Sequence, residues 1–496
     1  MKNNGKLYIT YFVMFCAVFL TTISAAQAKT FLVNVETDGH DQTPGDGSCA
    51  AAYRTCTLRA AIEEANALAG DDTIEFSQSF QAPNPPRTIV LMLGQLFVDS
   101  SLTIGGPGAR QLAVDGAQKD RIMTVNSQPH SPHAVLISGL TFQNGTPASN
   151  GYAQGGAIFV AWSDLTLRAV TVRNNKTIAR LWGQAGQGDG GGIFNFASHL
   201  TILDTTITGN VAEIRGGGLF SRDGSFFIYN STVSNNAAKQ NGGGIGQTDN
   251  STIRNTTISN NTAFQKGGGV WVENVDAQSG YNNFGNTIVA NNVAVVDNDV
   301  SGAINSLGNN LVKNRGASTG YLATDLPDGT DPKLGSLKNN GGPTDTRALL
   351  DLSPAIDAGD NCIVLGNPCA GEFQYDQRGF GFPRVNDRTV DIGAFEYKSV
   401  KLAFVQIRGK AFKTGGRGLG RAVVTLEQPD GATLSVETDE QGRFSFDAVE
   451  TGKAYVVKVR SGEHEFEPQT LIVNEDRNDV NFVPVDERPE TETPQD

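Results

Sequence analysis

Residues 216–220 read GGGLF, and twelve residues after Phe220 the stretch 232–236 reads TVSNN. A glycine run of this kind occurs five times, at 155–159 (GGAIF), 190–194 (GGGIF), 216–220 (GGGLF), 242–246 (GGGIG) and 267–271 (GGGVW). Aligned on the aliphatic residue, successive copies are separated by 35, 26, 26 and 25 residues. A period near 25 with two or three strands per repeat is typical of one coil of a parallel β-helix. Propeller blades repeat at about 40–45 residues, and leucine-rich repeats lack the glycine run.

Asparagine-rich turns accompany the glycine runs. They follow short β-branched strands, as in TITGN at 206–210, TISNN at 257–261 and TIVANN at 287–292, and residues 140–320 contain 25 asparagines. Asparagine tolerates the left-handed backbone of a tight corner, and stacked Asn side chains hydrogen-bond from coil to coil. Glycine suits corners that leave no room for Cβ. The sequence therefore predicts an all-β chain with a parallel β-helix solenoid over residues 29–398, of which 330–398 form the C-terminal end.

Residues 1–28 have the pattern of a secretory signal peptide. A basic start precedes an apolar run over 7–23, and Ala-Gln-Ala at 26–28 is an A-x-A cleavage site. About 17 apolar residues are few for a membrane span. We therefore expect export, to the extracellular space or the outer cell surface, and no transmembrane segment in the mature chain.

The segment 29–80 is expected to cap the first coil, because an open β-coil would present unpaired strands. A helix is predicted over 57–69. Thr57 can cap it, and one apolar face collects Leu58, Ala61, Ile62, Ala65 and Leu68.

The cysteines of an exported chain are expected to form disulfides. Two local pairs, Cys49–Cys56 and Cys362–Cys369, each have six residues between the partners. A four-cysteine metal site is the alternative, but zinc ligands are usually two to four residues apart. No metal site is predicted from these residues.

Residues 402–484 form a separate predicted unit. Alternating runs such as AVVTL at 422–426, RFSF at 443–446 and YVVKV at 455–459 are separated by turns containing Gly and Asp, the pattern of a small antiparallel β-sandwich. The acidic segment 485–496 is predicted to be a disordered tail.

Several blocks carry a family resemblance. Residues 56–66 (CTLRAAIEEAN) resemble the CSLREA motif of secreted bacterial β-helix proteins, with Thr57 and Ala60 departing from it. The choice-of-anchor Q region of the same proteins is similar to NGGPT at 340–344, SPAID at 353–357, DQRG at 376–379 and DIGAFE at 391–396. This resemblance implies an exported, right-handed, pectin-lyase-like β-helix and no particular activity. Residues 438–444 (TDEQGRF) resemble a turn of carboxypeptidase-regulatory-like modules, which implies a non-catalytic accessory.

The repeat register arranges charged side chains in rows. The position before each glycine run holds Gln154, Asp189, Arg215, Asn241 and Lys266. Asp223 and Asp249 are 26 residues apart on consecutive coils, so we expect them to stack at about 4.8 Å. Like charges that close raise the pKa of one partner, as an acid catalyst needs. With Arg222 they are the candidate catalytic residues; the alternative is that they are polar turn residues on a wet surface.

An aromatic column follows the aliphatic one. It consists of Phe159, Phe194, Phe220 and Trp271, and is broken at Gly246. Neighbouring residues of a strand face opposite sides, so aliphatic residues that point inward place these rings outside, where they suit sugar rings. The alternative is that a glycine bulge turns them inward as core.

The function classes follow from charge and fold. A net charge of −13 argues against nucleic-acid binding, which depends on clustered Lys and Arg. The preferred hypothesis is an adhesin-like scaffold that binds extracellular polysaccharide or cell-surface glycans; the alternative is a polysaccharide lyase or glycoside hydrolase acting on acidic polysaccharide. No cofactor is required. Calcium is compatible with Asp325, Asp328 and Asp331, although a Pro- and Gly-rich loop also accounts for them.

Overall fold

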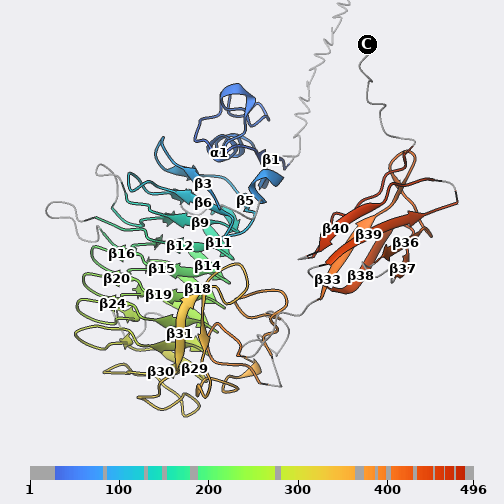
Figure 1. Cartoon of the computed structure of the whole chain (residues 1–496). Coiled ribbons are helices and arrows are strands. Elements are labelled where there is room, and N and C mark those ends of the chain that lie inside the picture. Colours follow the sequence, from blue (N-terminus) through green and yellow to red (C-terminus); the bar gives the residue numbers. More distant parts are fainter. Residues whose placement is uncertain are drawn as a thin grey trace, which may run out of the picture.

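A parallel β-helix forms most of the chain, and an antiparallel β unit follows it (Figure 1). The computed structural model describes residues 28–81, 86–127, 132–147, 153–178, 188–273, 281–362, 374–385, 389–397, 404–427, 433–450, 453–462, 464–473 and 476–485. The predicted signal peptide (but for its last residue), Cys369 and the tail from residue 486 lie outside these ranges. Within them, no helix has the length and apolar character needed to cross a membrane.

The coils stack into three parallel sheets, and each complete coil contributes one strand to each sheet. Sheet A consists of β1 (Thr30–Val33), β2 (Asp72–Phe76), β5 (Leu102–Gly105), β8 (Ala134–Ser138), β11 (Asp164–Arg168), β14 (His199–Leu203), β18 (Ser225–Tyr229), β22 (Asn250–Arg254), β26 (Asn282–Gly285) and β29 (Asn305–Gly308). Sheet B consists of β3 (Arg87–Val90), β6 (Leu112–Asp115), β9 (Thr141–Gln143), β12 (Thr171–Arg173), β15 (Thr206–Thr208), β19 (Thr232–Ser234), β23 (Thr257–Ser259), β27 (Ile288–Ala290) and β30 (Leu311–Val312).

Sheet C carries the strands that follow the glycine runs. It consists of β4 (Leu96–Val98), β7 (Met123–Asn126), β10 (Ile158–Ala161), β13 (Ile193–Phe196), β17 (Leu219–Arg222), β21 (Ile245–Gln247), β25 (Val270–Val272) and β28 (Val300–Ser301). Short strands β16 (Val211–Ala212), β20 (Ala237–Ala238) and β24 (Thr262–Ala263) add a small sheet at one corner. The parallel β-helix predicted from the 25-residue period is confirmed.

The predicted asparagine ladder runs through the corner after sheet B. Asn210 Nδ2 donates to Asn236 Oδ1 (2.9 Å), and Asn236 Nδ2 donates to Asn261 Oδ1 (3.0 Å). The ladder continues through Asn292, whose Nδ2 donates to Asp299 Oδ1 (2.8 Å). These side chains are buried, and burial raises the pKa of Asp299 to about 6. An aspartate therefore ends the ladder as the last acceptor.

The glycine runs form the corner before sheet C. Gly216 has a φ of +66°, a conformation that L side chains rarely adopt. A Cβ on Gly217 would lie 2.2 Å from the carbonyl oxygen of Gly243 in the next coil. The first glycine of the run is required by the backbone conformation and the second by the close stacking of coils.

The N-terminal segment contains the predicted helix. Helix α1 (Leu58–Ala67) begins after Thr57, whose side chain accepts a hydrogen bond from the backbone N–H of Ala60, and it packs against β1, β2 and β4. The predicted Cys49–Cys56 disulfide is present. The Cys362–Cys369 pairing stays a prediction because Cys369 is outside the described residues.

The described part of the region 330–398, the predicted C-terminal end region of the β-helix domain, folds back on the solenoid. Its hairpin β31 (Leu334–Lys338) and β32 (Thr346–Leu349) and the segments 374–385 and 389–397 return along sheet B (Figure 1). Arg347 Nε donates to Ser234 Oγ (2.8 Å), and Gln377 Nε2 donates to Thr206 Oγ1 (2.9 Å). The Thr and Ser side chains of sheet B are hydrogen-bond partners of this segment, so the segment covers one side of the solenoid.

A buried polar network of Asp376, Arg378, Asp391 and Glu396 fixes the returning segment. Arg378 forms an ion pair with Asp376, and the Asp391 backbone N–H donates to Glu396 Oε1 (3.2 Å). Burial raises the pKa of Glu396 to about 9 and that of Asp391 to about 6. These carboxyls belong to a structural network.

The C-terminal unit has two small antiparallel sheets around one apolar core. One pairs β33 (Phe404–Lys410) with β38 (Arg443–Glu450); the other has the order β37 (Thr433–Glu437), β36 (Val423–Glu427), β39 (Lys453–Arg460) and β40 (Gln469–Val473), and a short hairpin joins β34 (Phe412–Lys413) to β35 (Arg417–Gly418). The antiparallel β unit predicted after residue 402 is confirmed.

Candidate functional site

The aromatic column lies on the outer face of sheet C. Phe159 pairs in register with Phe194, and Phe194 with Phe220, with ring centroids 5.6 and 5.9 Å apart. The neighbouring aliphatic residues, such as Ile193, are fully buried in the main core, whereas the rings form a separate cluster. Strand alternation is maintained through the glycine corner, so the rings lie on the face of sheet C that points away from the main core.

Three of the four rings are nevertheless nearly buried, and we call the Phe220–Trp271 end of the outer face its covered half. Phe194, Phe220 and Trp271 are only 2 %, 0 % and 9 % exposed. The Arg215 guanidinium lies over the Phe220 ring, 4.4 Å from its centroid, and 5.8 Å from that of Trp271. Phe220 and Trp271 are too covered to offer an open sugar platform and do not line the groove described below, whereas Phe159 and Phe194 do line it.

Arg215 is held over the rings by an acid of the preceding coil and an acid two coils further on. Its Nη2 contacts Asp189 Oδ2 at 2.8 Å, and its Nη1 lies 3.7 Å from Glu273 Oε2. Burial raises the pKa of Asp189, and the hydrogen bonds and charge of Arg215 oppose that rise. Asp189 and Arg215 occupy equivalent positions before two successive glycine runs, so the repeat register alone places them on neighbouring coils.

Gly246 explains the break in the column. A Cβ at this position would lie 2.8 Å from Cδ2 of Phe220, and the residue pairs in register with Phe220 and Trp271. The missing side chain leaves space into which the Phe220 ring leans. The break is therefore part of the packing of the covered half.

The other half of the outer face of sheet C, at the Phe159 end of the column, opens into a groove with a volume of about 580 Å³. We call it the sheet C groove; it is lined by Gln95, Phe97, Arg121, Thr124, Asn126, Gln154, Phe159, Trp162, Phe194, Phe196 and Arg222. Phe97 is 56 % exposed and Trp162 is 36 % exposed. Trp162 meets Phe196 edge to face, with centroids 5.4 Å apart. The volume and the mixture of rings with polar groups are those of a ligand-binding pocket.

Two arginines make the groove positive. Arg121 lies 5.2 Å from the Phe159 ring centroid, and its Nη1 donates to Gln95 Oε1 (2.9 Å). Burial lowers the pKa of Arg121 to about 10, so its guanidinium is charged at neutral pH. Arg222 lies 5.3 Å from the Phe196 ring centroid. Arg121 is 6 % exposed and its Nη2 donates to the Gln154 carbonyl oxygen (2.8 Å), so it contributes charge to the groove. Arg222, whose side chain is 40 % exposed, is the guanidinium that a ligand can contact.

The predicted Asp223–Asp249 stack does not form. Ser221 pairs with Gln247, but Ser225 pairs with Asn250, so the register shifts by one residue between these points. Asp249 Oδ2 instead accepts a hydrogen bond from the backbone N–H of Gly224 (3.2 Å).

The two carboxylates are turn residues. Asp223 has a φ of +59° and its side chain is 61 % exposed, 3.4 Å from Arg222 Nε. Of the three candidate catalytic residues, only Arg222 lines the groove. The alternative that both acids are turn residues is the one that fits the structure.

Several groove residues were missed in the sequence. Phe196 follows Phe194 by two residues, so strand alternation alone places it on the same face. Trp162 follows a strand end and turns with a φ of +50°. Phe97 and Arg121 come from less regular coils that lack the glycine run, so the repeat gave no register for them.

The comparisons with known proteins assign no family. A scan against models of protein families finds no match, and no curated protein matches the sequence. Within the described ranges, no three His, Cys, Asp or Glu side chains are grouped as they would be to hold a metal ion. The candidate site therefore depends on its own geometry.

Proposed function

We propose that this chain is an exported, adhesin-like β-helix protein that binds glycans in the sheet C groove. The observation that carries the proposal is the groove itself, in which Phe97, Trp162 and Phe196 present ring surface beside Arg121 and Arg222. Aromatic faces bind the apolar faces of sugar rings, and guanidinium groups bind carboxylates with charge-assisted hydrogen bonds. An acidic polysaccharide fits this combination.

The resemblance of residues 56–66 and 340–396 to CSLREA and choice-of-anchor Q proteins supports export to the cell surface or beyond. The resemblance of 438–444 to a carboxypeptidase-regulatory-like turn likewise supports an accessory role for the C-terminal unit. Asp439 Oδ1 there accepts from the backbone N–H of Arg443 (2.8 Å), which closes that turn.

The test is binding of the mature chain to a panel of polysaccharides, with polygalacturonate and alginate as acidic members and dextran as a neutral one. We expect the variant Trp162→Ala/Phe196→Ala to bind the preferred polymer about tenfold or more weakly. Phe264→Ala is the matched control, because Phe264 is 73 % exposed and does not line the groove. Equal losses in both variants would contradict the proposal.

The same panel tests the enzymatic alternative. A lyase releases unsaturated products that absorb in the ultraviolet, and a hydrolase releases new reducing ends. We expect neither from any member, with or without Ca²⁺. Product release that Arg222→Gln abolishes would replace binding by catalysis as the function of the groove.

A further inference from the structure

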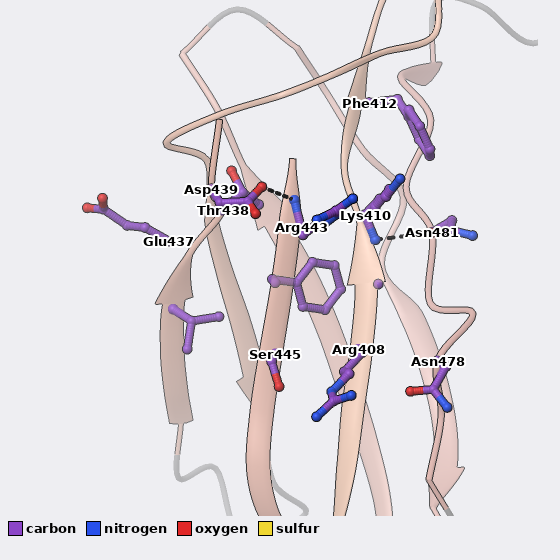
Figure 2. Close-up of a pocket in the computed structure, with 13 residues that line it drawn as sticks. Arg408, Lys410, Phe412, Glu437, Thr438, Asp439, Arg443, Ser445, Asn478 and Asn481 are labelled. Carbon is purple, nitrogen blue, oxygen red and sulfur yellow. Dashed lines mark hydrogen bonds between the residues drawn. The ribbon is translucent and has the colours of Figure 1, made fainter. Parts of the chain in front are cut away.

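A second charged surface lies on the C-terminal unit, on the outer face of β33 and β38 (Figure 2). Arg408 and Lys410 alternate along β33 with Ile407 and Gly409, and Ile407 is fully buried in the core. Because side chains of a strand alternate between faces, the two cations share the outer face. We call this surface the β33–β38 face.

The β33–β38 face concentrates positive charge. Lys410 lies directly opposite Arg443 of β38, and Arg408 lies opposite Ser445. Figure 2 shows the Arg443 side chain extending toward β33. Like charges directly opposite one another destabilise a strand pair, so the fold gains nothing from this arrangement.

Neighbouring acids do not neutralise these cations. Over the part of the chain that the structure describes, none of Arg408, Lys410 and Arg443 forms a side-chain ion pair. Asp439 uses Oδ1 to accept backbone N–H groups of its own turn, and Glu437 points away in Figure 2. The positive charge is left for a partner from outside.

The surface is also hollowed and polar. It forms a basin of about 760 Å³, whose rim includes Asn478, Asn481 and Ser445 beside the three cations. Phe444 is 5 % exposed beneath it. Amide and hydroxyl groups donate and accept hydrogen bonds as sugar hydroxyls require. A membrane surface would instead favour large exposed apolar side chains to enter the lipid.

We propose that the β33–β38 face is a second binding site, which takes the carboxylate or sulfate groups of an acidic polysaccharide. Arg408 and Lys410 are two residues apart on one strand, about 7 Å along its axis, and Arg443 lies across from Lys410. This spread suits anionic groups repeated along a polymer better than one compact ion. The site is independent of the sheet C groove and stands whether or not the groove binds glycans.

The test uses the mature full-length chain and two probes, heparin for sulfate and polygalacturonate for carboxylate. Binding is measured by calorimetry at low salt and again at about 0.5 M NaCl, where exposed charges are screened. The variant Arg408→Gln/Lys410→Gln/Arg443→Gln should bind at least one probe about tenfold or more weakly. Its melting temperature should not fall, because the like-charge pair is removed.

The matched control is Arg173→Gln/Lys176→Gln/Lys239→Gln, which removes the same charge from exposed positions on the solenoid. It should bind both probes within about twofold of the wild type. The Trp162→Ala/Phe196→Ala variant distinguishes this site from the sheet C groove. It alters the groove alone, so probe binding at the β33–β38 face should persist in it.

Three outcomes overturn the proposal. The first is an equal effect of the two triple variants, and the second is no binding of either probe by the wild type. The third is binding to vesicles containing an anionic phospholipid that the β33–β38 variant abolishes while polysaccharide binding is unchanged, which would make the face a membrane contact.

Discussion

The two halves of the outer face of sheet C have different surroundings. At one end Phe220 is 0 % exposed under Arg215, and at the other Phe97 is 56 % exposed beside Arg121. Both halves combine rings with guanidinium groups. In the covered half, Arg215 is tied to the buried carboxylate of Asp189, and the ion pair closes over the rings. In the open half the arginines line a groove.

The difference shows that an outward-facing aromatic ladder is not by itself a binding platform. The covered half stabilises the stacking of coils, and the open half is available to a ligand. Substitutions in the two halves should therefore separate stability from binding.

Phe220→Ala should have the largest effect on stability. Removing a fully buried ring leaves a cavity, and we expect a loss of about 3–5 kcal/mol in the free energy of unfolding. Urea denaturation followed by circular dichroism measures it. Phe97→Ala, in the open half, is the control and should cost less than about 1 kcal/mol. Similar losses in both variants would remove the distinction between the halves.

Arg215→Met tests what covers the rings. It leaves the Asp189 carboxylate buried without its ion-pair partner, which costs about 3 kcal/mol. Adding Asp189→Asn removes the unpaired charge, so the double variant should recover part of the lost stability. A double variant less stable than Arg215→Met would show that the cover depends on something other than this pair.

Gly246→Ala should have an intermediate effect. The new Cβ would lie 2.8 Å from the Phe220 ring and force it to move, at a cost of about 1–3 kcal/mol. Gly105→Ala is the matched control on a strand of sheet A, where the nearest atom is the Ile74 carbonyl oxygen at 3.9 Å. Thermal melting compares the two, and an unchanged melting temperature for Gly246→Ala would contradict the packing described.

The sequence predicted the solenoid well because stacking repeats the same residues at the same corners. The Asn210–Asn292 ladder and the outward column both follow from a constant register. The prediction that Asp223 and Asp249 stack was wrong because the register between the two coils shifts by one residue after Gln247. The 26-residue spacing of the glycine runs does not reveal this shift. Whether a ring is exposed depends on the side chain that lies over it. Arg215 covers Phe220 and Trp271 from the corner before the strand, so strand alternation does not predict this cover.

The open half is also expected to respond to pH through Arg121. Burial lowers its pKa to about 10, so the guanidinium is charged through neutral pH, and binding of an acidic polysaccharide should be flat between about pH 6 and 9. Above about pH 10 the charge is lost and affinity should fall.

Stability should move in the opposite direction over the same alkaline range. Between the lowered pKa of the folded state and the ordinary value of 12.5, the unfolded chain binds more protons at this group. The contribution of Arg121 to the free energy of unfolding therefore rises with pH, because the cost of burying its charge disappears.

Titration calorimetry at a series of pH values checks the affinity. We expect Arg222→Gln to keep the alkaline fall in affinity and Arg121→Gln to lose it. An alkaline fall that persists in Arg121→Gln would assign the titrating charge to another residue.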